Sequence, residues 1–316
     1  MQTLPASTAC HVLMVEPNDF RFNEETSGTN AFQNPKAADV AARALTQHRA
    51  LRDLLTANGV YVTLCQADPS TPDAPFCNNW FSTHPAMKGL RDAHGILEED
   101  VPPTLVLYPL LAENRRRERQ RTLIDGFFRR MYPRVMNMTF HEDQGRILES
   151  TGSLCMHDAA RTVYAAISPR TDPELAAAWA ERMGYRLVAF RAEDANGMLY
   201  YHTNVMMFIG HGIAGVCLES IVDAEERRTV EEALRASGLM VIPITRAQAA
   251  NFCGNALSLT NVHGEKLLVM SSRAWAHFTP AEQTLLEAQC RVLHTDLSSF
   301  EDAGGGSARC LIGELF

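Results

Sequence analysis

A thiol, an imidazole and a carboxylate stand at three separated points of this 316-residue chain, each beside glycine or other small residues. Cys310 follows Gly304–Gly306, and glycines allow backbone angles that can present the next reactive side chain in a fixed direction. His202 precedes Thr203, and Glu149 precedes a small-residue turn. Together these three types can supply a nucleophile, its acid and base, and a group that orients the base.

Two amides accompany these residues. Asn79 lies between the aromatic residues Phe76 and Phe81, and Asn204 lies two positions after His202. We predict a strand over 201–209, in which alternation places His202 and Asn204 on one face. Amides both donate and accept hydrogen bonds, so they can hold a neutral polar substrate.

Each of these residues also has an ordinary structural explanation. Neighbouring asparagines often form turns, a glutamate at a strand end is usually solvated, and a strand histidine is often a core residue. Cys310 could equally begin a buried final strand over 310–316, because free cysteine is among the most buried residue types. The combination of all of them in one chain favours a catalytic site.

The composition is that of a globular protein, with 46% hydrophobic and 21% charged residues. The net charge of −8 argues against a nucleic-acid partner. We find neither a leader segment nor an apolar run of membrane-spanning length, and therefore expect a cytoplasmic protein without membrane association. The 8 cysteines show no paired spacing and the histidines lack ligand spacing, so we predict reduced thiols, no metal and no cofactor.

Short apolar runs alternate with amphipathic stretches along the chain. Strands are predicted at 11–15, 60–66, 104–111, 147–156, 162–168, 185–190, 201–209, 215–221, 239–243, 256–259, 266–270 and 310–316. The five major helices are predicted at 36–57, 113–131, 173–183, 223–236 and 280–290. The repeated strand and helix unit, with no low-complexity linker, indicates one closed quasi-symmetric domain over 1–316.

The same residues carry a resemblance to a known superfamily. Met14–Pro17 with Phe22–Thr26, Asn78–His84, Leu148–Ser153, Tyr201–Met207 and the final glycine-rich Cys310 segment resemble the penteins, the guanidine-modifying enzymes related to arginine deiminases and amidinotransferases. Within this superfamily the chain is most similar to the bacterial citrulline utilization hydrolases (CtlX). The resemblance runs from residue 14 to residue 316.

This resemblance implies an α/β fold, a five-bladed propeller of ββαβ modules around a pseudo-fivefold axis with the active site in its central channel. It also implies that Cys310 is the nucleophile, His202 the general acid and base, and Glu149 the carboxylate that orients the histidine. We expect a lowered pKa for the Cys310 thiol and an unperturbed pKa near neutrality for His202. Ser150 departs from the superfamily, in which glycine is most common at that position.

Two further departures concern the substrate. Arginine deiminases hold a guanidinium cation between two carboxylates, and this chain has Asn79 and Asn204 at the matching positions. A neutral amide suits a ureido group better than a cation. We therefore predict a hydrolase of C–N bonds other than peptide bonds, which converts citrulline to ornithine, carbon dioxide and ammonia through a covalent Cys310 intermediate.

The substrate's carboxylate also needs an anchor. Arg116, in the basic segment 114–118, is the arginine that we predict for this role, because guanidinium forks bind carboxylates with two hydrogen bonds. A solvated helix face with local ion pairs is the alternative explanation of the segment.

Three functions stay open: the citrulline hydrolase, an amidinotransferase or an amidinohydrolase acting on arginine or dimethylarginine, and a non-catalytic binding module. The first two take a small ureido or guanidino amino acid as partner. A homo-oligomer is compatible with each of the three.

Overall fold

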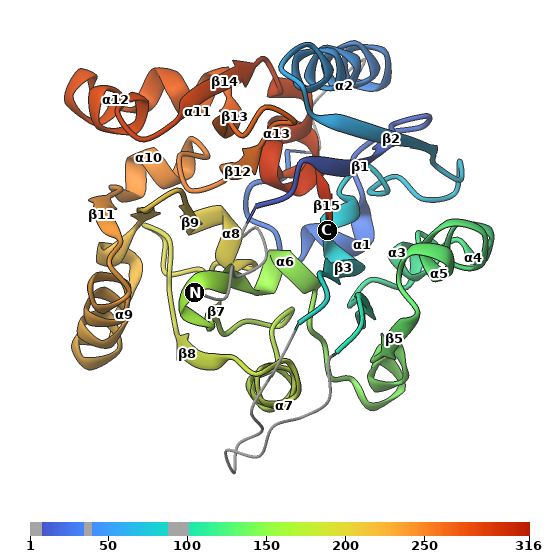
Figure 1. Ribbon diagram of the computed structural model, residues 1–316, viewed down its shortest axis with the longest axis horizontal. Helices are drawn as coiled ribbons and strands as arrows, with labels where there is room; N and C mark the ends of the chain where they lie inside the picture. Colours follow the sequence, from blue (N-terminus) through green and yellow to red (C-terminus); the bar gives the residue numbers. More distant parts are fainter. Residues whose placement is uncertain (1–7, 35–39, 88–100) are drawn as a thin grey trace.

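The computed structural model describes residues 8–34, 40–87 and 101–316 (Figure 1). Within these residues the strands form five three-stranded sheets, so the fold is mixed α/β. Sheet by sheet, the strands are β15 (Gly313–Leu315), β1 (His11–Glu16) and β2 (Tyr61–Gln66); β3 (Phe81–His84), β4 (Thr104–Leu107) and β5 (Arg134–Asn137); β6 (Cys155–His157), β7 (Thr162–Ala166) and β8 (Arg186–Phe190); β9 (Met207–Gly210), β10 (Ile213–Val216) and β11 (Met240–Pro243); and β12 (Leu257–Thr260), β13 (Lys266–Ser271) and β14 (Arg291–Thr295).

The same pairing recurs in every sheet. The middle strand is antiparallel to one neighbour and parallel to the other. Parallel neighbours need a crossover, and helices form all or part of it in each sheet. These helices are α1 (Glu24–Ser27), α2 (Val40–Ala57), α3 (Glu113–Arg116), α4 (Arg121–Leu123), α5 (Arg129–Met131), α7 (Pro173–Met183), α9 (Ala224–Ala236), α11 (Ser272–His277) and α12 (Pro280–Glu287). The predicted repetition of one strand and helix unit is confirmed.

The two ends of the described chain meet in one sheet. The C-terminal strand β15 pairs with β1, with His11 opposite Leu315. In Figure 1 the five sheets follow one another around the molecule in the order of the sequence. The segment that carries Cys310 is therefore adjacent to strands from the beginning of the chain.

Sequence signals explain where several helices begin and end. Asp172 accepts a hydrogen bond from the Leu175 amide at the start of α7, and Gly184 ends that helix with a φ of 68°. Thr279 and Glu282 form a reciprocal capping box at the start of α12. The helix predicted at 36–57 is present as Val40–Ala57, and its predicted start at Lys36 lies outside the described residues.

The local structure beside the candidate residues differs from the prediction. The run predicted as a strand over 201–209 begins with a helical turn, α8 (Thr203–Met206), before β9. The strand predicted over 147–156 contains another turn, α6 (Ser150–Ser153). Cys310 belongs to a 3₁₀ turn over Ala308–Leu311 rather than to a strand. Segments of four residues are too short to show a helical period, and buried small residues permit either conformation.

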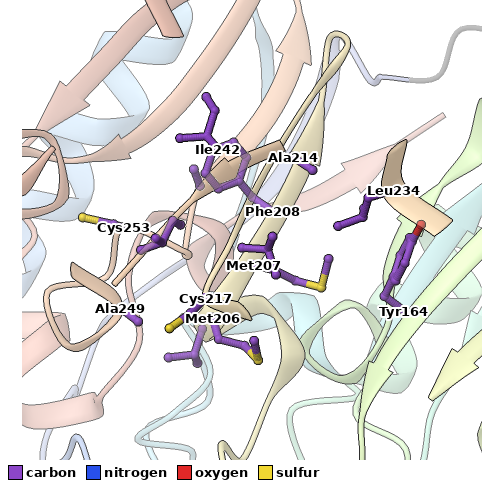
Figure 2. Packing of buried hydrophobic residues seen from close by; sticks show 14 of the residues in the cluster. Tyr164, Met206, Met207, Phe208, Ala214, Cys217, Leu234, Ile242, Ala249 and Cys253 are labelled. Carbon is purple, nitrogen blue, oxygen red and sulfur yellow. The ribbon is translucent and has the colours of Figure 1, made fainter. Parts of the chain in front are cut away.

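Buried apolar side chains connect neighbouring sheets. Figure 2 shows Met206, Met207 and Phe208 packed among side chains such as Tyr164 and Ile242 from adjacent elements. Met206 and Met207 are fully buried. This packing fixes the chain directly after His202, which limits the positions that the imidazole can take.

Candidate active site

Residues distant in the sequence meet at one buried pocket. Cys310, His202 and Asn79 line it, and Glu149 lies directly behind His202. All four side chains are at most 3% exposed. The pocket has a volume of about 10 Å³, close to the space for one water molecule. We call it the front pocket.

A short hydrogen bond joins the imidazole to the carboxylate. Nε2 of His202 lies 2.7 Å from Oε2 of Glu149. An ionised carboxylate only accepts hydrogen bonds, so Nε2 carries the proton and donates it. Nδ1 is then the basic nitrogen of the neutral ring, and it lies against Gly152, where a Cβ would come within 2.8 Å of it. The pair thus selects the tautomer in which Nδ1 can accept a proton.

Glu149 is held in its ionised form. Burial by itself would raise its pKa, but the nearby Arg170 guanidinium and the hydrogen bond from His202 hold the pKa well below its ordinary value. Nη1 of Arg170 lies 3.5 Å from Oε2 of Glu149, and the Leu111 amide donates to Oε1 at 3.1 Å. A permanent negative charge therefore stands behind the histidine.

The prediction of an unperturbed pKa near neutrality for His202 is wrong, because this side chain is buried. Burial lowers the pKa of His202 to about 4, although the hydrogen bond and charge of Glu149 act in the opposite direction. The imidazole is therefore neutral at pH 7. Spacing along the sequence does not reveal such complete desolvation.

The expected lowered pKa of Cys310 is also corrected. Burial raises the pKa of this thiol, while its hydrogen bonds to the Ser307 backbone and to the Asn255 side chain partly offset that effect. Nδ2 of Asn255 donates to Sγ at 3.3 Å. At pH 7 the front pocket consequently holds Cys310 as a thiol and His202 as a neutral imidazole.

Asn79 has one end of its amide fixed. Its Oδ1 accepts a hydrogen bond of 2.8 Å from Nη1 of Arg115. An arginine can only donate, so the oxygen must face Arg115 and the NH₂ group must face the other way. Nδ2 is buried and has no partner among the described residues. Asn79 therefore presents a donor without an acceptor.

Asn204 lies on the other side of the sulfur. Its Oδ1 is 3.9 Å from Sγ of Cys310 and 3.4 Å from Nδ2 of Asn255. Asn204 is not among the residues that line the front pocket, but it lines a separate, larger cavity. The structure thus places one predicted amide in the pocket and the other behind the thiol.

The predicted anchor, Arg116, does not reach the pocket. Its side chain donates to the carbonyl oxygens of Leu110 and Leu111 and lies 3.5 Å from Glu142. Its neighbour Arg115 lines the pocket instead. Adjacent positions on a helix point about 100° apart, so only one of the two side chains can face inward.

Sequence reasoning missed further residues of the site. Asp73, Arg115, Arg170 and Tyr201 line the front pocket. Arg115 is paired with Glu118 through two contacts of 2.7 and 3.0 Å. Oδ1 of Asp73 is buried without a partner in the described part of the chain. Asp73 lies in a segment whose proline and aspartate content predicts a turn, and that explanation gave no reason to add it to the site.

The described residues contain neither a candidate metal centre nor a helix suited to cross a membrane. Within residues 8–34, 40–87 and 101–316, no group of three or more histidine, cysteine, aspartate or glutamate side chains could hold a metal ion. Among the helices of the same residues, none has the length and apolar character needed to cross a membrane.

A family comparison covers nearly the whole chain. The model for N,N dimethylarginine dimethylhydrolase, eukaryotic, matches residues 16–316. No curated protein sequence matches significantly.

Solved structures share the fold at low sequence identity. Unliganded AgrE is 20% identical with a TM-score of 0.72, over 97% of this chain and 39% of the AgrE chain. The N-terminal domain of ArgZ, a cyanobacterial arginine dihydrolase, bound to its substrate, is 18% identical with a TM-score of 0.71, over 96% of this chain and 97% of that domain. An adduct of dimethylarginine dimethylaminohydrolase is 19% identical with a TM-score of 0.62, over 96% of this chain and 99% of that one. This chain thus spans about 40% of the full ArgZ chain.

Proposed function

The chain belongs to the N,N dimethylarginine dimethylhydrolase family, and from that premise we propose that it is a cysteine-dependent hydrolase of a C–N bond in citrulline. The resemblance to the guanidine-modifying superfamily is confirmed by this membership and by the related folds. The narrower similarity to the citrulline utilization hydrolases stays a prediction. We further infer that the five sheets are the blades of one closed propeller over residues 1–316.

The free donor of Asn79 is the observation that carries the choice of substrate. Arg115 occupies the amide oxygen, so Asn79 can offer only N–H groups to a ligand. A guanidinium also has only donors, and the two would face each other without an acceptor. The carbonyl oxygen of a ureido group supplies that acceptor. Asn79 therefore favours citrulline over arginine.

The first half-reaction that we propose releases ammonia. The thiol proton of Cys310 passes to Nδ1 of His202 as Sγ bonds to the ureido carbon. Asn79 donates to the carbonyl oxygen as negative charge develops on it. The bond from this carbon to the terminal nitrogen then breaks, and that nitrogen takes the proton from His202. Ammonia leaves, and a thiocarbamate joins Cys310 to the δ-nitrogen of the substrate.

The second half-reaction uses the same imidazole. Nδ1 of His202 takes a proton from water as the water oxygen adds to the thiocarbamate carbon. The C–S bond breaks, and the sulfur of Cys310 recovers the proton from His202. The released carbamate loses carbon dioxide and leaves ornithine. Glu149 stays ionised and stabilises the imidazolium that exists in both halves.

The size of the front pocket requires movement before substrate can enter. Nδ2 of Asn30 and Nε2 of Gln33 both donate to the carbonyl oxygen of Gly304, at 3.1 and 3.2 Å. These two hydrogen bonds join the segment after α1 (Glu24–Ser27) to the glycine turn before Cys310. An amino acid cannot occupy about 10 Å³, so we infer that these contacts open when substrate binds.

Arginine hydrolysis is the second candidate, because one observation favours it. Oδ1 of Asp73 is a buried carboxylate oxygen without a partner in the described chain, and it could accept from a guanidinium. The ammonium group of citrulline can fill the same acceptor. An amidinotransferase uses the same thiol and imidazole but passes the amidino group to an amine.

Ammonia release from citrulline and from arginine, together with dimethylamine release from N,N-dimethylarginine, separates these functions. We expect ammonia and ornithine in equal amounts from citrulline, and no more than a trace of ammonia from arginine or of dimethylamine from dimethylarginine. Cys310→Ala should abolish turnover, whereas Cys290→Ala, which removes another buried thiol, should retain it. Ammonia from arginine at a comparable rate would replace citrulline hydrolysis with an arginine hydrolase. Transfer to an amine without net hydrolysis would identify an amidinotransferase.

A further inference from the structure

A second cavity, much larger than the front pocket, lies on the other side of Asn204. It has a volume of about 240 Å³, and we call it the rear cavity. Its lining comes from β6 (Cys155–His157), β9 (Met207–Gly210) and the residues around Cys310, including Arg309 and Glu314. By the same measure a single water needs roughly 10–15 Å³, so this space suits a molecule of amino-acid size.

The wall of the rear cavity carries more carboxylates than arginine or lysine side chains. Asp158 and Glu314 line the rear cavity, and among the lining residues that the structure describes Arg309 is the one arginine or lysine. Arg309 is already engaged, since its Nη2 donates to Oε2 of Glu314 at 2.8 Å and its Nη1 donates to the Ile312 carbonyl at 3.0 Å. Asp158 therefore has no arginine or lysine partner among the described residues of the cavity wall, although Arg161 and His157 lie near enough to lower its pKa.

Both carboxylates retain an acceptor. Oδ1 of Asp158 accepts from the Tyr185 hydroxyl at 2.5 Å, and within the described residues no hydrogen bond reaches its Oδ2 or Oε1 of Glu314. Burial raises the pKa of both carboxyls, and Asp158 raises that of Glu314 further. Both carboxylates line the same cavity, so a cation bound there can be attracted by each of them.

Two buried polar atoms at the same wall also lack partners. Asn204 is 3% exposed and Ser258 is 4% exposed, and both line the rear cavity. Neither Nδ2 of Asn204 nor Oγ of Ser258 has a hydrogen-bond partner in the described part of the chain. A buried donor without an acceptor destabilises the fold, and a polar ligand that supplies the acceptor removes that cost.

We propose that the rear cavity is a second ligand site, separate from the front pocket, that binds a small molecule carrying a primary ammonium group. The ammonium lies between Asp158 and Glu314, where three N–H donors meet the two unused carboxylate oxygens. An acceptor elsewhere on the ligand, such as a hydroxyl or a second polar group, receives the N–H of Asn204. This proposal does not depend on the reaction at Cys310.

Calorimetric titration with 1,4-diaminobutane tests the site, with 1,4-butanediol as the uncharged probe of equal length. We expect the wild-type protein to bind the diamine and not the diol. Asp158→Asn keeps the contact with Tyr185 but removes the charge, and it should weaken diamine binding about tenfold or more. Asp143→Asn removes an exposed carboxylate elsewhere and should leave binding unchanged.

Two further measurements keep the outcome decisive. Glu314→Gln should weaken diamine binding as Asp158→Asn does. The same loss in two separate variants is not explained by a local folding defect in one of them. In Cys310→Ala protein saturated with citrulline, which cannot be turned over, the diamine should still bind. Wild-type affinity in both carboxylate variants, equal binding of the diol, or displacement of the diamine by citrulline would each overturn the rear site.

Discussion

Cys310 lines the front pocket and Asn204, whose Oδ1 lies 3.9 Å from Sγ of Cys310, lines the rear cavity, but the two neighbouring regions differ in almost every other property. The front pocket holds about 10 Å³ and the rear cavity about 240 Å³. In front, two arginines and their carboxylates are buried and paired. In the rear, one carboxylate has no arginine or lysine partner on the described wall. The candidate reaction site is therefore distinguished by oriented charges and not by its volume.

This contrast follows from what each region must do. A reaction site has to hold dipoles in place before the substrate arrives, because reorienting them during the reaction costs free energy. The pair of His202 and Glu149 and the pair of Arg115 and Asn79 are fixed in this way. A site that only binds a ligand needs less order and more volume.

The largest effect on kcat should come from removing the negative charge of Glu149, which lies behind the His202 imidazole. Glu149→Gln removes the ion that fixes the tautomer of His202, and we expect kcat for citrulline to fall by about 10²–10⁴. Glu142→Gln is the matched control, since Glu142 is also a buried carboxylate paired with an arginine, Arg119, but lies outside the front pocket. Steady-state kinetics of both variants measure the difference. Equal losses in the two would show that Glu149 acts only through stability.

A substitution of Asn79 tests whether the front pocket prefers a ureido group to a guanidinium group. Asn79→Asp keeps the acceptor for Arg115 and replaces the free donor by a second carboxylate oxygen. We expect the ratio of kcat/KM for citrulline to kcat/KM for arginine to fall about tenfold to hundredfold, because a ureido oxygen would then meet an acceptor. Asn251→Asp adds the same charge outside the front pocket and should leave the ratio unchanged. An unchanged ratio in Asn79→Asp would remove the argument for citrulline.

The repeated architecture could be predicted from the sequence, and the site only in part. Alternating apolar runs and helical periods predict five units, and the structure has five sheets in the described residues. The structure brings together Cys310, His202, Glu149 and Asn79, which were singled out by residue type. Their catalytic roles stay predictions.

What the sequence could not show depends on direction and burial. The spacing that suggested Arg116 cannot decide which of two adjacent helical residues points inward, and the structure turns Arg115 to the pocket. Asp73 lies in a segment that predicts an ordinary turn, and Asn255 directly precedes a predicted strand, so neither was added to the site. The pKa values of His202 and Cys310 depend on how completely the surrounding chain excludes water, which no local pattern reveals.

His84, a buried histidine that lines the rear cavity, should make the stability of the fold depend on pH. Burial lowers the pKa of His84 to about 3, and its Nε2 lies 2.8 Å from Oγ of Ser82. Because the folded pKa lies below the unfolded value of about 6.5, His84 costs no stability above pH 6.5 and destabilises the fold as the pH falls below that value. His84→Gln cannot titrate and can still bond Ser82.

Urea unfolding at pH 7.5 and pH 5 measures this dependence. We expect the free energy of unfolding to fall by about 2 kcal/mol less in His84→Gln than in the wild type between these two pH values. His141→Gln changes an exposed side chain and should behave as the wild type does. An identical pH dependence in His84→Gln and the wild type would mean that His84 is not the buried neutral group that the structure describes.

The smallest effect should appear at Asn255, on the boundary between the two regions. Its Nδ2 donates to Sγ of Cys310 at 3.3 Å and favours the thiolate, while burial favours the thiol. Asn255→Ala removes that donor and should raise the pKa of Cys310 further. A hydrogen bond to a charged group contributes about 1.5–3 kcal/mol, of which a sulfur acceptor at this distance supplies the lower part, so we expect about a tenfold slower alkylation of Cys310, because a smaller fraction of it is thiolate.

Iodoacetamide labelling followed by peptide mass mapping measures that rate, with the exposed Cys10 as the internal reference. In the wild type at pH 7, Cys10 should be alkylated before Cys310, because burial raises the pKa of Cys310 and limits access to it. The ratio of the Cys310 rate to the Cys10 rate should fall about tenfold in Asn255→Ala and stay constant in Asn251→Ala. Labelling of the buried Cys253 would reveal unfolding, and only a fall without such labelling supports the role of Asn255. If the ratio is the same with and without Asn255, the sulfur is held by the front pocket alone, and the amides behind it do not influence its ionisation.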